Sequence, residues 1–321
     1  MRTSTVVGPG SDAAVVRLRG TSKAIAATVD CNGRYAYLNP FRGGQIAVAE
    51  AARNLVCSGA IPRAVTDNLN FGNPLKPEVY YQLSEAIRGI GEACRVLSTP
   101  VTGGNVSLYN ENPRGAIYPT PTIGMVGVVE DLAHVTRSAF QESGDVVILL
   151  GRNTDELGGS EYLKAVHALV AGDAPAMDLA AERILQVALL EAIRAGLVRS
   201  AHDCSEGGLA VALAESAIGD GARPLGLTVE LHDELPANAL FFGEAQSRVV
   251  VSCRPGDEVE LLERMERHGV PAVAIGRVDD ENARFQLRTR DAVVDEEIAA
   301  LASLYFGAIP RRMDGSTVES A

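Results

Sequence analysis

Two short polar stretches of the sequence carry residue types suited to phosphate and metal chemistry. They are residues 66–74, with the sequence TDNLNFGNP, and residues 100–109, with the sequence PVTGGNVSLY. Each contains glycine and follows an apolar run, so each is predicted to form a turn. Glycine lets backbone N–H groups approach phosphoryl oxygens, and Asp and Asn offer the oxygen ligands that Mg²⁺ accepts. Together they predict a phosphate and metal site, against the alternative of two ordinary turns.

The length and charge of the chain bound the classes of function that such a site can serve. A chain of 321 residues is long enough for about two domains, each with its own core. The formal net charge of −12 argues against nucleic acid as a main partner, because duplex binding depends on clustered Lys and Arg. A phosphate ligand must therefore be neutralised locally by Mg²⁺, backbone amides and a few arginines.

Further sequence features predict where the protein works. No apolar run approaches the roughly 18 residues that span a bilayer, and the start of the sequence lacks the apolar region of a secretory signal. The five cysteines are odd in number and never spaced as C-x-x-C, which argues against a zinc ribbon or a disulfide framework. These observations predict a cytoplasmic protein with reduced thiols and no membrane partner.

The elements that must position the two stretches alternate along the first half of the chain. Short β-branched runs predict strands, and apolar residues recurring every three or four positions predict helices. The predicted strands are residues 13–18, 24–29 and 122–129, and the predicted helices are residues 44–57 and 77–97. The first domain, residues 1–140, is therefore expected to be α+β, with two helices covering one face of a small sheet.

The second domain, residues 141–321, is expected to be α/β. A buried strand at residues 146–150 opens it, and a long helix follows with Asp178 as its N-cap. The remaining predicted elements are helices starting at residues 207 and 257 and a strand at residues 270–275.

Seven motifs in order along the chain mark it as similar to a known family. They are the two polar stretches and five further runs: DAAVV at 12–16, EAARNLV at 50–56, DELGGSEY at 155–162, HDCSEGGL at 202–209 and FGEAQSR at 242–248. Together they resemble the second half of phosphoribosylformylglycinamidine synthase, the synthetase subunit of the fourth step of purine biosynthesis. The resemblance covers nearly the whole chain, and seven motifs in register are far more specific than one.

The resemblance implies both a fold and an activity. The fold is the two-domain unit of the aminoimidazole ribonucleotide synthetase-like superfamily, in which an N-terminal α+β domain pairs through its sheet and a C-terminal α/β domain packs outside it. The activity is that of an ATP-dependent C–N ligase in de novo purine biosynthesis. It converts formylglycinamide ribonucleotide, ATP and glutamine-derived ammonia to formylglycinamidine ribonucleotide, ADP and phosphate. The family's chain holds two such domain pairs, and this sequence resembles only the second.

Four residues carry over from the family's motifs. The resemblance makes Asp67 and Gly104 nucleotide contacts, Asn105 a magnesium ligand and Ser107 a contact to the substrate. No catalytic residue is expected, because the family's catalytic histidine and most of its metal-binding carboxylates belong to the first domain pair. The chain is thus expected to form half of a site for ATP and Mg²⁺, completed by the N-terminal half of the synthase or by a second copy of this chain. A glutaminase subunit and a small accessory subunit are further implied partners.

The polar residues that precede the predicted helix at residue 207 invite a catalytic interpretation. His202 and Cys204 are nevertheless interpreted as a structural histidine and a packed thiol, because free cysteine is among the most buried residue types. Asp203 and Glu206 are expected to shape the start of the helix, where carboxylates meet the helix dipole favourably.

Two features leave alternatives open. The Glu244–Gln246 run resembles a substrate-contacting run of the family's first half, so it marks either an auxiliary nucleotide site or a structural element. Asp12 is a similar case, because a single Asp is a sparse ligand set for Mg²⁺. Two other functions remain: a catalytically silent scaffold half with a structural nucleotide, or a homodimeric small-molecule kinase or synthetase of the same superfamily.

Overall fold

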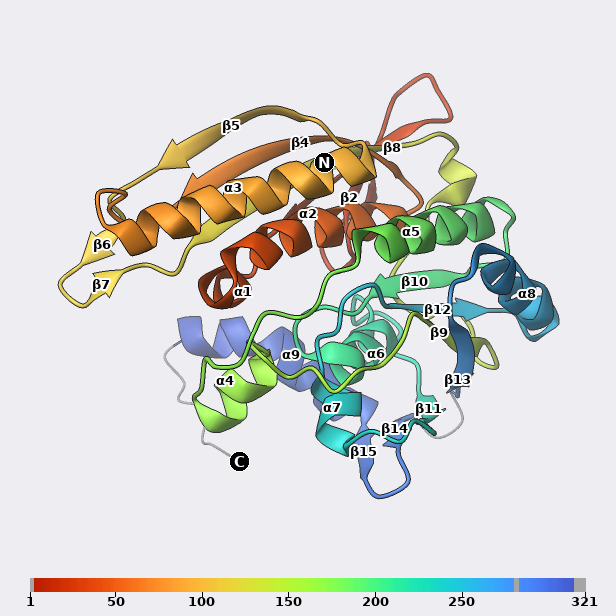
Figure 1. Ribbon diagram of the computed structural model, residues 1–321. Helices are drawn as coiled ribbons and strands as arrows, with labels where there is room; N and C mark the ends of the chain where they lie inside the picture. Colours follow the sequence, from red (N-terminus) through yellow and green to blue (C-terminus); the bar gives the residue numbers. More distant parts are fainter. Residues whose placement is uncertain (1–2, 280–282, 315–321) are drawn as a thin grey trace.

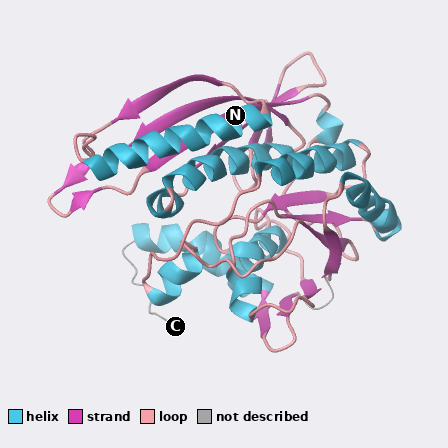
Figure 2. Ribbon diagram, viewed as in Figure 1, coloured by secondary structure: helices cyan, strands magenta, loops and turns pink. Residues whose placement is uncertain are grey.

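The computed structural model describes residues 3–279 and 283–314. Each half of the chain builds its own layers of sheet and helix, and the two halves lie against each other (Figure 1). Helices and strands are mixed along both halves, as Figure 2 shows, and the α+β class expected for the chain is confirmed. In this part of the chain, no helix combines the length and the apolar character that crossing a bilayer requires.

The N-terminal half is a six-stranded sheet with its long helices on one face (Figure 1). Its elements are β1 (Thr5–Val7), β2 (Ala14–Arg17), β3 (Ala24–Asp30), α1 (Gly33–Leu38), α2 (Pro40–Cys57), β4 (Ile61–Asn70), α3 (Pro77–Leu97), β5 (Val101–Ser107), β6 (Glu111–Asn112), β7 (Gly115–Ala116), β8 (Thr120–Val129) and the short helix η1 (Leu132–His134). The strand order is β1-β2-β3-β8-β4-β5, so β5 is an edge strand. Strands β4 and β5 run parallel and are connected through α3.

The two polar stretches belong to strands, so the prediction of two turns is wrong. Residues 66–70 complete β4 and residues 101–107 form β5, and the chain leaves the sheet only after Asn70 and Ser107. In β4, Val65 and Leu69 are buried in the core beneath the helices. Residues two or four positions apart lie on the same face of a strand. The polar residues and glycines between the apolar positions concealed this pattern in the sequence.

Local capping explains where the two long helices begin and end. Helix α3 has the predicted bounds: Pro77 lies in its first turn, and Ser98 ends it in the left-handed conformation with φ 59°. Helix α2 begins at Pro40 rather than at residue 44. The reason is Asn39, whose side chain accepts a hydrogen bond from the N–H of Arg42 and caps the helix.

The C-terminal half is a seven-stranded sheet with helices on both faces. Its elements are β9 (Val146–Leu150), α4 (Glu161–His167), α5 (Leu179–Arg194), β10 (Ser200–Asp203), α6 (Gly208–Ile218), β11 (Leu227–Glu230), α7 (Ala237–Phe242), β12 (Val249–Cys253), η2 (Pro255–Asp257), α8 (Glu258–His268), β13 (Ala272–Val278), β14 (Arg284–Arg288), β15 (Val293–Glu297) and α9 (Ile298–Met313). The order is β10-β12-β9-β13-β11-β14-β15. Alternate residues of β9 enter different cores, which explains why this strand is apolar throughout.

Several elements of the C-terminal half match the sequence pattern. Strand β9 has the predicted bounds, and Asp178 caps α5 by accepting from the N–H groups of Ala180 and Ala181. Strand β13 covers 272–278 instead of 270–275, because Gly269 and Val270 still form the turn that ends α8. The sequence pattern did not predict α4, α7 or α9.

The two halves meet along α2, which packs against α5 and β10. The first sheet ends with β8 at Val129, and the second begins with β9 at Val146. The predicted boundary between residues 140 and 141 lies in the segment that connects these two strands. The division into residues 1–140 and 141–321 stays a prediction.

Candidate functional site

The four predicted site residues lie on the paired strands β4 and β5. Asp67 is the register partner of Gly104, and Asn105 and Ser107 pair with residues of β4 in the same parallel ladder. The ladder thus brings together two stretches that are separated by the whole of α3. Because side chains alternate along a strand, Asp67 and Gly104 belong to one face of the sheet, and Asn105 and Ser107 belong to the other.

Asp67 lies on the face that the helices cover, in line with the buried Val65 and Leu69. Its carboxylate lies over the backbone of Gly104: a Cβ built at Gly104 would be 2.0 Å from Asp67 Oδ1. At Gly103, by contrast, a Cβ would meet nothing within 4 Å. Partial burial raises the pKa of the Asp67 carboxyl. The absence of a Cβ at Gly104 therefore makes room for the Asp67 side chain itself, in addition to any ligand.

Asn105 and Ser107 lie on the opposite, open face of the sheet. Asn105 Nδ2 donates to Asn68 Oδ1 at 3.1 Å, which leaves the carbonyl oxygen of Asn105 as the group that can meet a cation. The Ser107 hydroxyl exchanges hydrogen bonds with the side chain of Asn110, at 3.1 and 3.3 Å. Because β5 is the edge of the sheet, one ligand lying at that edge can reach groups on both faces.

The oxygen atoms at this edge of the sheet fit part of a magnesium site. Asn105 supplies one neutral amide oxygen, while the carboxylate of the ladder, Asp67, points to the other face. Mg²⁺ takes oxygen ligands in near-octahedral geometry and is usually held by carboxylates, water and substrate phosphates together. The edge therefore fits a metal ion that a nucleotide and another polypeptide hold jointly with it.

A second candidate site, the acidic pocket, lies where the two halves of the chain meet. It has a volume of about 470 Å³ and is lined by residues of β3, α2, β10 and α6, with Tyr305 of α9 at its wall. Its carboxylates are Asp12, Asp30, Glu50, Asp203, Glu206 and Glu215. Such a concentration of partly desolvated like charges requires protons, arginines or a bound cation to compensate it.

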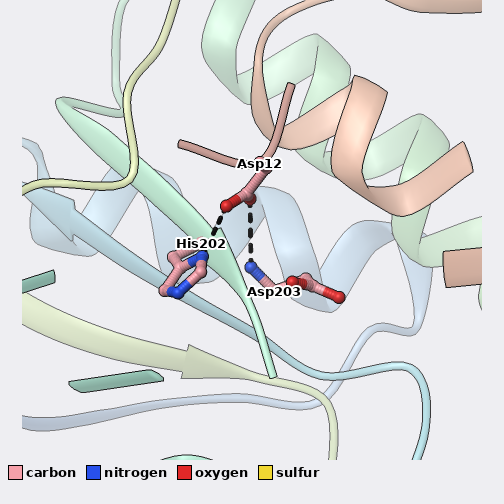
Figure 3. A group of neighbouring side chains, drawn as sticks. All are labelled: Asp12, His202 and Asp203. Carbon is pink, nitrogen blue, oxygen red and sulfur yellow. Dashed lines mark hydrogen bonds and ion pairs between the residues drawn. The ribbon is translucent and has the colours of Figure 1, made fainter. Parts of the chain in front are cut away.

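Asp12, His202 and Asp203 form a compact group in the acidic pocket (Figure 3). One ligand atom from each lies within 4.8 Å of the others. His202 Nδ1 is 2.5 Å from Asp12 Oδ1, and its Nε2 is 3.0 Å from Glu215 Oε2. The backbone N–H of Asp203 donates to Asp12 Oδ2 at 3.2 Å. Carboxylate and imidazole groups converging at this spacing are suited to hold a divalent cation.

Burial raises the pKa values of three carboxyl groups in the acidic pocket, those of Asp203, Asp30 and Glu50. It raises the pKa of Asp203 to about 7, although the Arg53 guanidinium acts in the opposite direction. Burial also raises the pKa values of Asp30 and Glu50 well above the usual range for carboxyl groups. Because a cation stabilises the ionised forms, its binding in the acidic pocket must release protons.

His202 carries a proton that competes with a cation. Burial alone would lower the pKa of His202, but the adjacent Asp12 carboxylate reverses the effect and raises it well above its usual value. Both ring nitrogens face carboxylates, so the imidazolium donates to Asp12 and Glu215. An imidazolium cannot bind a metal ion, so a cation that uses His202 must displace its proton.

Arg53 of α2 is a fully buried cation behind the acidic pocket. Its guanidinium lies 2.8 Å from Glu182, 3.1 Å from Gln246 Oε1, 3.4 Å from Asp203 and 3.7 Å from Glu50. Burial disfavours its charge, but Glu182 and the other carboxylates raise its pKa above the usual value. Arg53 therefore fastens α2 to the C-terminal half through an ionic contact.

Glu244 is fully engaged by partners within the protein. Its Oε1 accepts from the N–H of Gly207 at 2.8 Å and from the N–H of Glu161 at 2.7 Å, and its Oε2 accepts from the Tyr35 hydroxyl. The side chain is completely buried. These hydrogen bonds join α1 to the starts of α4 and α6. The geometry favours the structural interpretation of the run that begins at Glu244.

The residues before α6 differ in part from expectation. Cys204 is fully buried, which agrees with a packed thiol. The prediction that Asp203 and Glu206 shape the helix start is wrong. The cap of α6 is Gly207, without a side-chain hydrogen bond, while Glu206 accepts from Asn32 and Asp203 faces Arg53. Both carboxylates thus interact with residues that are distant in the sequence and not with the start of α6.

Sequence reasoning missed Asp30, Glu50 and Arg53 as members of the acidic pocket and its surroundings. Glu50 and Arg53 lie one turn apart on the buried face of α2, within a run rich in alanine. Charged residues are almost never fully buried without a partner. Charges on the core-facing side of an apolar helix were therefore the signal that could have identified the group.

Comparison with known proteins places the chain in a family. Two models match it in succession, "AIR synthase related protein, N-terminal domain" over residues 10–129 and "AIR synthase related protein, C-terminal domain" over residues 142–287. Phosphoribosylformylglycinamidine synthase subunit PurL of Moorella thermoacetica is 55% identical over 277 residues. The match covers 86% of this chain and 37% of that relative, so the chain spans little more than a third of the relative's length.

Solved structures share the fold. PurL of Thermotoga maritima complexed with FGAR gives a TM-score of 0.77 at 22% identity, over 94% of this chain and 49% of that chain. Its complex with ATP gives 0.73 at 23% identity, over 94% and 48%. PurLQS from the same organism gives 0.71 at 22% identity, over 90% and 46%. The resemblance drawn from the seven motifs is confirmed: the chain belongs to the family of AIR synthase related proteins and is similar to phosphoribosylformylglycinamidine synthase subunit PurL.

Proposed function

We propose that the chain acts as the second half of an ATP-dependent phosphoribosylformylglycinamidine synthase. The observation that carries the proposal is the identity of 55% to PurL over 86% of the chain. The residues that the family's motifs assign to nucleotide, metal and substrate lie together on two paired strands at a sheet edge. An edge site with one neutral metal ligand fits half of an active site, which a second polypeptide completes.

The open face of the N-terminal sheet supports pairing with that second polypeptide. Val29 is 71% exposed and Val126 is 42% exposed on neighbouring strands, although both lie in the middle of the sheet. Alternation along β2, β3 and β8 places further apolar side chains on this face: Val16 and Ile25. Exposed apolar surface of this kind marks an interaction site. Its partner in the proposal is the N-terminal half of the synthase, and a second copy of this chain is the alternative.

The proposed reaction activates an amide by phosphoryl transfer. The γ-phosphoryl group of ATP moves to the formylglycinamide oxygen, giving an iminophosphate and ADP, and ammonia then displaces phosphate to leave the amidine. In-line phosphoryl transfer requires positioning and charge neutralisation above all. In this chain Asp67 and Gly104 hold the nucleotide, Asn105 offers an oxygen to Mg²⁺ and the Ser107 hydroxyl positions the substrate. Mg²⁺, when bound, supplies positive charge to the phosphates.

The ammonia is proposed to come from a glutaminase partner. The Thermotoga maritima relative has been solved as PurLQS, an assembly whose name joins PurL with two further components. By similarity, we assign this chain a glutaminase partner and a small accessory partner. Its five free thiols fit work in the reducing cytoplasm.

The acidic pocket favours a second candidate function, a structural nucleotide held with a divalent cation in a catalytically silent half. The specific observation is the group Asp12, His202 and Asp203, whose ligand atoms lie within 4.8 Å of one another. Such a site would stabilise the contact between the two halves of the chain, because its residues come from both. It requires no turnover.

Reconstitution tests the proposal. ATP- and ammonia-dependent amidine formation is measured for the chain alone, for a matching N-terminal half alone and for the mixture. We expect activity only in the mixture, and we expect Asn105→Ala and Asp67→Ala to reduce it, while the exposed control Asn238→Ala in α7 leaves it unchanged. ATP hydrolysis by the chain alone would instead identify a small-molecule kinase, and an inactive mixture that binds ATP would identify a scaffold.

A further inference from the structure

A second cavity, here called the α5 pocket, lies within the C-terminal half and is separate from the acidic pocket. It has a volume of about 470 Å³ and shares no lining residue with the acidic pocket. Its walls come from the first turns of α5, the segment after β9, the loop before β12 and the turn between α8 and β13. A preformed pocket of this size lies in the range that buries a small organic ligand.

The floor and one wall of the α5 pocket are apolar. Leu185 and Val270 are buried at its base, and Met177 and Pro271 lie at its sides. Ile184, on the exposed side of α5, is 44% exposed and also lines the pocket. An apolar surface left open to water between a helix and a turn gains free energy when a flat apolar body covers it.

The acidic groups of the α5 pocket already have partners. The Glu156 carboxylate accepts from the N–H of Ala176 at 2.6 Å and from the Thr154 hydroxyl at 2.9 Å. Asp178 accepts from backbone N–H groups as the cap of α5. These neutral donors fix both side chains in place, and both carboxylates keep acceptor capacity and their negative charge.

Arg152 is the exception among the charged residues that line the pocket. Within residues 3–279 and 283–314, no hydrogen bond or ion pair is described for its guanidinium, although five N–H donors are present on this group. A guanidinium pairs best with a planar or tetrahedral anion that can accept two hydrogen bonds. Arg152 is exposed and is the positively charged residue among those that line the pocket, so it can pair with an anionic group on the ligand.

The wall opposite α5 is held in a fixed shape. Ser247 has a left-handed backbone, with φ 58°, which is uncommon for a residue with a side chain. Its hydroxyl donates to Glu182 at 2.5 Å, and Glu182 in turn accepts from Arg53. A Cβ at Gly151 would lie 2.2 Å from the Ser247 carbonyl oxygen, so the two backbones are in close approach. The pocket is thus pre-organised, which reduces the entropic cost of binding.

We propose that the α5 pocket is a ligand site for a small organic anion with a planar aromatic or heteroaromatic body. The body lies between α5 and the turn before β13, and the anionic group pairs with Arg152. This inference is independent of the proposed synthase activity, because none of Asp67, Gly104, Asn105 and Ser107 lines the pocket.

The test uses 8-anilinonaphthalene-1-sulfonate as an aromatic anion and the uncharged N-phenyl-1-naphthylamine as its neutral counterpart. Fluorescence titration and calorimetry of the intact chain are expected to give one site for the sulfonate. Ala181→Trp, which places an indole into the pocket from the exposed side of α5, should abolish it. Val187→Trp introduces the same side chain on α5 away from the pocket and should leave binding intact.

A second pair of variants tests the charge. Arg152→Ala should weaken sulfonate binding about tenfold, the loss typical of one charge-assisted hydrogen bond, and should leave the neutral probe unaffected. Arg183→Ala removes an exposed arginine from the same helix outside the pocket and should change neither. Circular dichroism verifies that each variant is folded. Sulfonate binding that survives Ala181→Trp, or that Arg152→Ala and Arg183→Ala weaken equally, would overturn the proposal.

Discussion

The carboxylate of Asp67 occupies the space in which a side chain at Gly104 would lie. The two residues are register partners on parallel strands, and a Cβ at Gly104 would approach Asp67 Oδ1 to 2.0 Å. Two residues that the family's motifs assign to one nucleotide are therefore also sterically dependent on each other. Glycine at position 104 leaves the space that the Asp67 carboxylate occupies, and it does so before any ligand binds.

This dependence predicts a difference between adjacent glycines. Gly104→Ala is expected to displace the Asp67 side chain and to destabilise the protein by about 1–3 kcal/mol, as overpacking does. Gly103→Ala meets nothing within 4 Å and is expected to be neutral or stabilising by up to about 1 kcal/mol. Urea unfolding of both variants measures the difference. Equal effects would show that Asp67 does not hold the position described.

Removal of the buried arginine is expected to be among the most damaging single changes. Arg53→Met leaves Glu182 and Asp203 as buried carboxylates without their cation, and breaking such a contact costs about 3–5 kcal/mol. Arg183→Met, at an exposed position of α5, serves as the control. Chemical unfolding gives both free energies. If Arg53→Met lowers the free energy of unfolding by less than about 1 kcal/mol, the carboxylates take up protons at little cost and the contact with Arg53 does not stabilise the protein.

Cation binding in the acidic pocket is expected to strengthen with rising pH. Folding raises the pKa of Asp203 to about 7 from its ordinary value of 3.8. The contribution of Asp203 to the stability of the folded state is therefore fully present below its pKa in the unfolded chain, 3.8, and is lost as the pH rises through about 7. The carboxylate that forms is the proposed metal ligand, so Mn²⁺ affinity should be about tenfold lower at pH 6 than at pH 8.

Calorimetric titration with Mn²⁺ at several pH values measures this dependence. Loss of the His202 proton acts in the same direction, since it also frees Asp12. Asp12→Asn should abolish binding, and Asp155→Asn, at an exposed position outside the pocket, should not. Mn²⁺ affinity that is independent of pH would contradict a site built on Asp203.

The open face of the N-terminal sheet should control association. Val29→Glu places a charge on the exposed apolar face, beside the acidic pocket, and is expected to weaken association with the N-terminal half, or with a second copy, by at least tenfold. Val166→Glu introduces the same charge at a similarly exposed valine of α4 and should have no effect. Analytical ultracentrifugation of the chain alone and of the mixture distinguishes the two cases. Association unchanged by Val29→Glu would place the interface elsewhere.

The parts of the structure that depend on neighbouring residues could be predicted from the sequence. The bounds of α3 follow from its apolar period and its first-turn proline, and the start of α5 follows from the cap at Asp178. The polar stretch around Gly103 and Gly104 was misjudged as a turn. Glycine is compatible with both turns and strands, and pairing with β4 decides between them.

By itself the sequence determined the family, because the order of motifs along a chain can be recognised without knowledge of contacts, and the resemblance named the four residues that the fold brings together on β4 and β5. Only the tertiary structure decided that Asp67 and Asn105 lie on opposite faces of the sheet and that a buried arginine joins the two halves. Arg53 and Glu182 are 129 positions apart, yet their atoms are 2.8 Å apart. Whether a charged residue is a solvated surface group or a buried ion depends on which distant segments surround it, and packing alone sets that environment.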